Sequence, residues 1–111
     1  LLKRSRNSTH QTQSLRVADL ELDLMRKVAI RGGKVIELTA KEFALLEYFM
    51  RNSGRVLSRA DISEKVWNIT YDTGTNIVEV YVNILRKKID RDFEPKLIHT
   101  RIGLGYIFTD A

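Results

Sequence analysis

The segment NIVEVYVNILRKKID, residues 76–90, combines amide, carboxylate and basic side chains at spacings that fit one amphipathic helix. Successive side chains of an α-helix lie about 100° apart, so residues three, four and seven apart share a face. One face carries an apolar stripe that predicts burial in a core: Val78, Val82, Leu85 and Ile89. The opposite face mixes polar, apolar and basic side chains: Asn76, Val80, Asn83 and Lys87. Glu79 and Arg86 flank this second face on one side, and Ile84 flanks it on the other.

This mixture fits the edges of base pairs in the major groove of double-stranded DNA. Asn bonds to adenine, Glu accepts from the amino group of cytosine, and small apolar groups contact the thymine methyl. Lys and Arg at the edges of such a helix bind phosphates, which fix its position without reading sequence. The alternative is an ordinary solvated helix, because single exposed valines are common and a terminal Arg-Lys-Lys run complements the helix dipole. The helix alone fits that alternative better, so the neighbouring elements decide between the two.

Alternation of apolar and polar residues before this helix predicts short antiparallel strands with one buried face. The residues expected on the buried face are Leu15, Val17, Leu20, Leu22, Leu24, Val28, Ile30 and Val35. Gly32 and Gly33 predict a two-residue hairpin turn, because both turn positions tolerate positive φ. Residues 18–19 and 23–27 predict two further turns, so a four-stranded antiparallel sheet is expected.

Two helix starts follow the sheet and are built in the same way. In LTAKEF (38–43), Thr39 caps the helix and Glu42 closes a capping box, while Leu38 contacts Phe43. The same four roles in LSRADI (57–62) fall to Ser58, Asp61, Leu57 and Ile62. The first helix is expected to end before Gly54, and the second to run from Arg59 to about Trp67.

The order of elements favours a DNA-reading helix. Residues 96–108, KLIHTRIGLGYIF, predict two strands that turn at the glycines. A sheet, three helices and a terminal hairpin form an α+β chain with a winged helix-turn-helix. In that layout the third helix reads the major groove and the hairpin wing approaches the backbone or minor groove.

Of the 111 residues, 43% are hydrophobic and 30% are charged, a composition that is typical of one globular domain. The net charge is +5, of which the first fourteen residues supply +3; residues 15–111 hold 16 Lys and Arg against 14 Asp and Glu. Residues 3–14 are polar, so residues 1–14 are predicted to form an interdomain linker or flexible tail, which leaves 15–111 as the folded domain. No cysteine is present, so thiolate metal sites are excluded, and no apolar run is long enough to cross a membrane. The chain starts at Leu1 and is expected to be a fragment of a longer protein.

Several motifs together resemble the C-terminal effector domain of OmpR/PhoB-type response regulators: LTAKEFALLEYF, GRVLSRADISEKVW, TNIVEVYVNILRKKID and KLIHTRIGLGY. Within that family, the phrasing of residues 75–100 is similar to the heavy-metal (copper) response branch. The resemblance implies a bacterial, cytoplasmic two-component transcription factor that binds double-stranded DNA. A receiver domain, absent from this chain, would precede it and be phosphorylated by a sensor kinase. RNA polymerase is a further implied partner, and two copies are expected on direct-repeat half-sites. No cofactor is implied.

The resemblance also assigns site residues. Positions that face bases are Glu79, Val80, Asn83 and Ile84. Positions that meet the DNA backbone are Trp67, Asn76, Tyr81, Arg86 and Thr100, to which the basic side chains add Lys87 and Arg101. The loop implied to contact RNA polymerase comprises Asn68, Ile69, Thr70, Tyr71, Asp72, Thr73 and Gly74.

Two departures from the family pattern stand at these sites. Asn83 and Ile84 replace a common Arg-Arg pair, and Arg101 lies one position earlier than the usual wing arginine. Side chains alternate along a strand, so this shift predicts that the Arg101 guanidinium turns to the other face of the wing.

Other chemistries fit less well. GLG (103–105) lacks the strand, loop and helix of a phosphate-binding site, and His10 and His99 are the chain's two histidines. Ser58 and Thr39 are helix caps rather than nucleophiles, so no enzymatic activity is expected. A rival function is a winged-helix protein-interaction module in which Val80 and Ile84 contact a partner protein. Binding of structured RNA is a third alternative.

Overall fold

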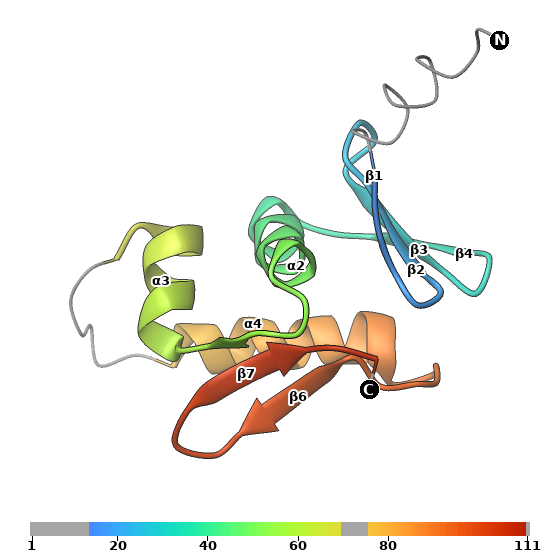
Figure 1. Ribbon diagram of the computed structural model, residues 1–111. Helices are drawn as coiled ribbons and strands as arrows, with labels where there is room; N and C mark the ends of the chain where they lie inside the picture. Colours follow the sequence, from blue (N-terminus) through green and yellow to red (C-terminus); the bar gives the residue numbers. More distant parts are fainter. Residues whose placement is uncertain (1–13, 70–75, 111) are drawn as a thin grey trace, which may run out of the picture.

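The computed structural model describes residues 14–69 and 76–110 (Figure 1). In chain order the elements are β1 Ser14–Val17, β2 Leu20–Asp23, β3 Val28–Arg31, β4 Lys34–Glu37, α2 Ala40–Arg51, β5 Val56–Leu57, α3 Arg59–Trp67, α4 Ile77–Leu85, the π-helical turn η1 Arg86–Asp90, β6 Ile98–Arg101 and β7 Gly105–Phe108. The predicted α+β winged helix-turn-helix is confirmed. Among the described residues, no helix is long and apolar enough to cross a membrane.

The amino-terminal sheet is an antiparallel meander in the order β1-β2-β3-β4. Its last turn is formed by Gly32 and Gly33 at φ +60° and +78°, as the sequence predicts. The four-stranded sheet is therefore confirmed, with its turns at the expected places. The expected linker up to residue 13 lies outside the described residues, and Ser14 is already the first residue of β1.

The predicted buried face of β3 and β4 is wrong. Val35 is 51% exposed and Val28 and Ile30 are half-buried, whereas Ala29, Arg31 and Ile36 are buried. The strand register is the reason. Leu22 pairs with Ala29, and Ala29 pairs with Ile36, so these three side chains share the core face of the sheet. Leu24, also expected on this face, is half-buried in the turn after β2.

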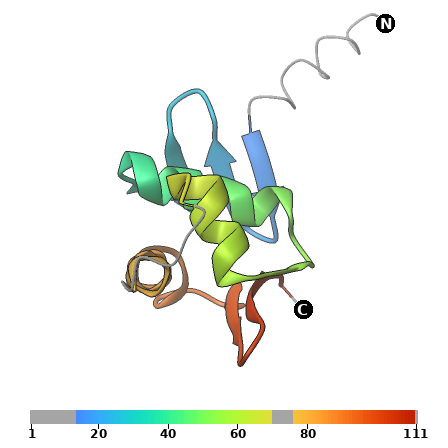
Figure 2. The same ribbon diagram turned by 90° about the vertical axis from the view of Figure 1, so that its left-hand side faces the viewer.

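The three helices and this sheet share one hydrophobic core, with α4 below α2 and α3 (Figures 1 and 2). At the start of α2, the backbone N–H of Thr39 donates to Glu42 Oε1 at 3.0 Å and that of Glu42 to Thr39 Oγ1 at 3.4 Å, which confirms the capping box. Ser58 caps α3 by accepting from the N–H of Asp61 at 3.0 Å, but among the described residues no bond from the Ser58 N–H to the Asp61 carboxylate closes the expected second capping box. The apolar stripe predicted for the third helix is buried as expected, with Val82 fully inaccessible.

The carboxy-terminal wing contains a strand that the sequence analysis missed. The two-residue strand β5, between α2 and α3, pairs with β7, so the wing sheet has the order β5-β7-β6. Gly105, at φ +133°, permits this close pairing, because a Cβ there would collide with the backbone carbonyl of Leu57. The helix-turn-helix connection and the wing therefore share one sheet.

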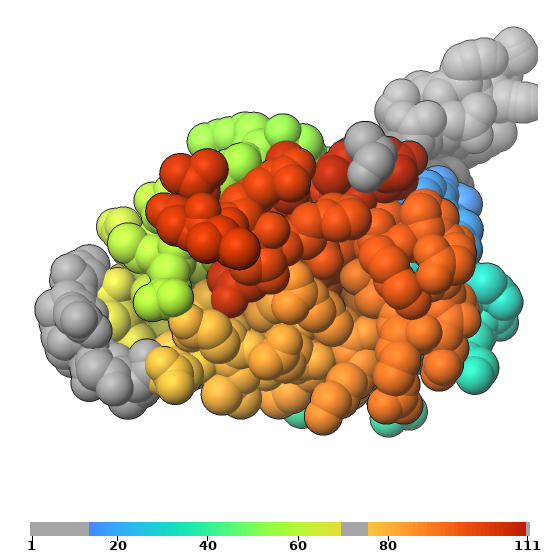
Figure 3. All heavy atoms as spheres, turned by 90° about the horizontal axis from the view of Figure 1, so that it is seen from below, coloured from blue at the N-terminus to red at the C-terminus, as the bar shows by residue number. Residues whose placement is uncertain are grey.

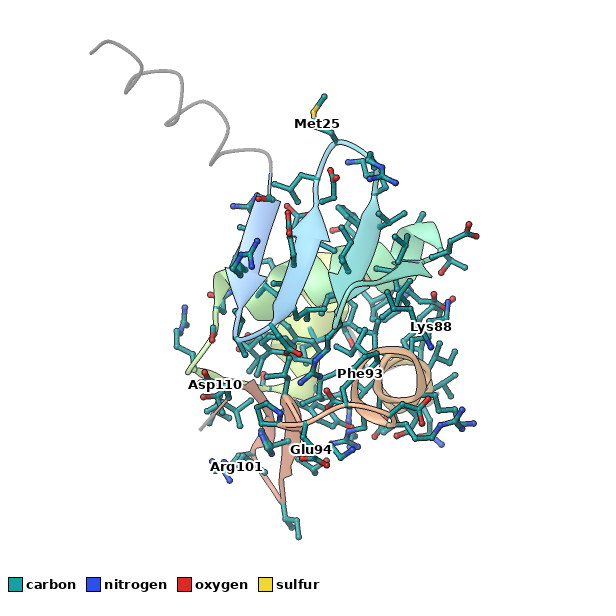
Figure 4. All side chains as sticks on the ribbon, turned by 90° about the vertical axis from the view of Figure 1, so that its right-hand side faces the viewer. Met25, Lys88, Phe93, Glu94, Arg101 and Asp110 are labelled. Atoms are coloured by element: carbon teal, nitrogen blue, oxygen red, sulfur yellow. The ribbon has the colours of Figure 1, made fainter. Side chains whose placement is uncertain are left out.

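A buried arginine joins the amino-terminal sheet to the end of the third helix. The Arg31 side chain is fully buried; its Nε donates to Asp19 Oδ1 at 2.9 Å. Its terminal nitrogens donate to the Ile89 carbonyl at 2.6 Å, to Asp90 Oδ1 at 3.0 Å and to the Pro95 carbonyl at 2.5 Å. The guanidinium also lies 5.2 Å from the ring centre of Phe93, which Figure 4 shows between the sheet and the end of α4.

Asp90 connects Arg31 to the wing strand β6. Its carboxylate accepts from the backbone N–H of Leu97 at 3.0 Å and from that of Ile98 at 2.9 Å, where β6 begins. Arg31 and Asp90 thus compensate each other's charge inside the protein while fixing where the wing leaves the helix. Burial of either charge alone would cost several kcal/mol, on the order of 3–5.

We expect Arg31→Ala to lower the free energy of unfolding by about 3–5 kcal/mol, because the buried Asp90 carboxylate loses its cation. Urea denaturation followed by circular dichroism measures this loss. The matched control is Arg16→Ala, which removes the exposed 3.0 Å pair between Arg16 and Glu21 in the same sheet and should cost less than about 1 kcal/mol. Equal losses in the two variants would contradict a special role for the buried pair.

Candidate nucleic-acid interface

The face of α4 opposite the core is open to solvent. Val80 is 51% exposed, and Asn83 and Lys87 are exposed beside it, as the helical spacing predicts. Viewed from below, α4 and the wing lie side by side on one face of the molecule (Figure 3). The helix therefore presents a surface that combines an aliphatic group, an amide and an ammonium group within two turns.

The flanks of α4 are occupied by contacts to other elements. On the wing side, Arg86 donates to Thr100 Oγ1 at 2.6 Å and to the Ile98 carbonyl at 3.4 Å. On the opposite side, Lys88 donates to Glu42 Oε1 at 2.5 Å, at the start of α2. Of the basic run at residues 86–88, Lys87 is thus the member that points outward without an ion pair among the described residues.

A groove of about 710 Å³ runs between the end of the third helix and the wing strand β6. The basic side chains that line it are Arg86, Lys87, Arg91, Lys96 and Arg101. The one carboxylate in the lining, Asp90, is paired with Arg31, so the groove carries a net positive charge. A groove of this charge attracts a polyanion.

The groove cations differ in how freely they can bind a ligand. Lys96 donates to the carbonyls of Asp90, Arg91 and Phe93 at 2.7–3.2 Å and so serves as a cap for the helix end. Lys87, Arg91 and Arg101 form no ion pair within the described part of the chain, and all three are exposed. These three side chains are the ones available to phosphates.

Comparison with known proteins identifies the family that carries this surface. Residues 33–108 match the family described as "Transcriptional regulatory protein, C terminal". The chain belongs to this family. The transcriptional activator protein IrlR of Burkholderia pseudomallei is 50% identical over 102 residues, which are 92% of this chain and 44% of IrlR. The transcriptional regulatory protein PcoR of Escherichia coli is 48% identical over 107 residues, 96% of this chain and 46% of PcoR. The chain therefore spans less than half the length of these curated relatives.

Solved structures agree with this family. The RstA DNA-binding domain from Klebsiella pneumoniae, crystallised in complex with the RstA box, matches with a TM-score of 0.79 at 26% identity, covering 89% of this chain and 99% of that one. The DNA-binding domain of CpxR from E. coli matches with a TM-score of 0.77 at 30% identity, covering 88% and 97%. The resemblance predicted from the motifs, to OmpR/PhoB-type effector domains and their heavy-metal (copper) response branch, is confirmed.

Five of the eleven residues expected to face DNA line one groove of this effector domain. Asn83, Arg86, Lys87, Thr100 and Arg101 all line the groove. Arg101 also lines the groove, and in Figure 4 its side chain extends from the wing away from the end of α4. The expected turn of its guanidinium to the other face of the wing stays a prediction. Sequence reasoning missed Arg91 and Lys96, which follow the basic run at residues 86–88 but are separated from it by acidic and apolar residues.

Three other predicted site residues lie near the amino-terminal end of the third helix. Trp67 and Tyr81 are half-buried and meet edge-on, with ring centres 5.0 Å apart. Asn76 is exposed as the N-cap residue of α4 and forms no side-chain capping bond. Ile84 is half-buried on the flank away from the wing.

The predicted polymerase-contact loop begins with Asn68, which is exposed with φ +57° as the C-cap of α3, and Ile69, which is half-buried. Its remaining positions, 70–74, lie outside the described residues. Within the described residues, no group of three or more His, Asp or Glu side chains is placed to hold a metal ion. His99 lies in the groove lining, with Nε2 3.1 Å from the Thr109 carbonyl.

Lys88 is a structural side chain although it belongs to the basic run. Burial would raise the pKa of the Glu42 carboxyl, but the hydrogen bonds from Lys88 and the Thr39 backbone outweigh it and the pKa is lowered. The Lys88 amine also donates to the Glu37 carbonyl at 3.0 Å. This contact joins the end of the third helix to the start of α2 and keeps Lys88 from the exposed face.

We expect the domain to lose stability on acidification partly through Glu42. A carboxyl with a lowered folded pKa stabilises the fold above its unfolded pKa, about 4.5, and this stability is lost as the pH falls through the folded pKa. Glu42→Gln should therefore lose less stability than the parent protein between neutral pH and pH values below about 4.5. Thermal melts across this range measure the difference. Glu64→Gln, at an exposed position on α3, should follow the parent; an identical pH profile for Glu42→Gln would contradict the assignment.

Proposed function

We propose that this domain binds double-stranded DNA sequence-specifically, as the effector domain of a two-component response regulator that controls transcription. The observation that carries the proposal is the cationic groove beside the exposed face of α4, with Lys87, Arg91 and Arg101 unpaired among the described residues. The similarity to the RstA domain crystallised with the RstA box supports the same function.

In this proposal α4 enters the major groove and one strand of the duplex backbone follows the groove beside β6. Val80, Asn83 and Ile84 contact base edges, since an amide bonds to adenine and aliphatic groups touch thymine methyls. Lys87, Arg91 and Arg101 bind phosphates. Arg86 acts mainly by holding Thr100, so that helix and wing meet the backbone at a set separation. Trp67, Asn76 and Tyr81 bind the backbone at the other end of the helix.

The remainder of the proposal concerns the larger protein. A receiver domain phosphorylated by a sensor kinase would control the effector domain, and two copies would bind direct-repeat half-sites about one helical turn apart. Asn68 and Ile69 begin the segment proposed to contact RNA polymerase. No enzymatic activity is proposed for this domain, and the site of action is the bacterial cytoplasm, where the DNA lies.

Titration of fluorescent duplexes at several salt concentrations tests this function against the rival protein-interaction module. Neutralising several phosphates makes log affinity fall steeply with log salt, whereas an apolar contact of Val80 and Ile84 with a protein would respond little. Selection from random duplexes would then provide the preferred sequence and the spacing of repeats. Absence of salt-dependent binding to any duplex would refute the proposal.

We expect Lys87→Ala to weaken binding to all duplexes about equally and to reduce the salt slope by about one, because one phosphate contact is lost. The cleanest control is Arg26→Ala, which removes the same charge from the exposed turn between β2 and β3, next to Met25 at the end of the sheet far from α4 (Figure 4). An unchanged slope for Lys87→Ala would remove this side chain from the phosphate-binding set.

Asn83→Ala should act differently, because a base contact carries sequence information. We expect a loss of about 1–3 kcal/mol on the preferred site, with relaxed preference at one or two base pairs. Competition between the preferred site and single-base variants measures this change. A loss of equal size on every sequence would show that Asn83 binds backbone instead.

A further inference from the structure

An ion pair links the first helix of the helix-turn-helix to the DNA-facing helix. Glu79 Oε2, on α4, lies 2.6 Å from a terminal nitrogen of Arg59, the first residue of α3. The Glu79 side chain is 29% exposed and that of Arg59 is 64% exposed. Glu79 lies one helical turn before Asn83, on the flank that faces the wing rather than on the outward face.

The Glu79 carboxylate depends on Arg59 for compensation. Its other oxygen, Oε1, is buried and has no hydrogen-bond partner among the described residues. The Tyr106 side chain is close by: burial, and next the Glu79 carboxylate, raise the pKa of its hydroxyl. A half-buried carboxylate with one unsatisfied oxygen holds its cation more firmly than two fully exposed side chains hold each other.

Arg59 lies on the surface offered to DNA. The start of α3 adjoins α4 and the wing on the face seen in Figure 3. An exposed guanidinium at this position would bind phosphates of any duplex, because contacts to phosphates do not depend on sequence. In the structure, however, that guanidinium is already paired with Glu79.

We propose that Glu79 is a specificity-determining residue that acts through Arg59. Because Glu79 keeps the Arg59 guanidinium in an ion pair, that guanidinium does not bind a phosphate. DNA of unrelated sequence thereby loses one contact that does not depend on sequence. Discrimination improves because the contacts that remain depend more on base edges. Glu79 in this account is a positioning residue and touches no base. The inference rests on the proposed DNA-binding function.

The test compares variants on a random-sequence duplex and on the preferred site. Glu79→Gln should tighten binding to the random duplex roughly threefold to tenfold and steepen the salt slope by about one, as Arg59 becomes free to bind a phosphate. The ratio of affinities for preferred and random duplexes should fall. In Arg59→Ala/Glu79→Gln, which removes both charges, affinity for the random duplex and the salt slope should return to those of the parent.

Glu47→Gln is the matched control, because Glu47 pairs with Arg51 at 2.9 Å on α2 and its change removes the same charge from another helix. If Glu79→Gln raised the affinity for the random duplex no more than Glu47→Gln does, the change in net charge would explain the effect and the proposal would be overturned. The proposal would also be overturned if Arg59→Ala/Glu79→Gln kept the higher affinity for the random duplex, or if it bound that duplex more weakly than the parent. Lost preference at one base pair, with unchanged random-duplex affinity, would show that Glu79 reads a base directly. Failure of the parent protein to bind any duplex is a separate result, against the proposed function itself.

Discussion

The buried pair of Arg31 and Asp90 is the interaction on which the arrangement of this domain depends. One guanidinium binds the turn after β1, the end of the third helix and the segment before β6, which are far apart in the sequence. Asp90 adds the first backbone amides of β6. Two hydrophobic residues of similar volume could fill the same space at little cost in stability, but they would not specify these carbonyls and amides. The pair therefore defines orientation more than it adds stability.

Much of the fold follows from local patterns. The capping box of α2, the Gly-Gly turn and the 100° spacing of α4 each involve residues within one or two turns of one another, so the helices and hairpins were predictable. The failures have a common origin in contacts between distant segments. Alternation alone does not decide which of two apolar faces in β3 and β4 is buried, and the strand register selects Ala29 and Ile36. A two-residue strand such as β5 is too short for any periodicity to reveal.

At the candidate interface too, local patterns were predictable from the sequence and contacts between distant segments were not. Helical spacing correctly places Val80, Asn83 and Lys87 on the outward face. It does not tell which members of a basic run are occupied, because Lys88 binds Glu42 of α2 and Arg86 binds Thr100 of the wing. Nor does it pair Glu79 with Arg59, twenty positions earlier in the chain. Charge available to a ligand is thus a property of tertiary structure, even where charge itself is evident from the sequence.

The strand β5 has a consequence for how such domains diversify. Hydrogen bonds between β5 and β7 attach the wing to the connection between two helices through main-chain atoms, and Gly105 allows that attachment. The position of the wing relative to the connection between α2 and α3 is consequently set by the polypeptide backbone rather than by side chains. Substitution of the outward side chains on α4 leaves this backbone attachment unchanged. New recognition preferences can therefore arise while the position of the wing stays the same.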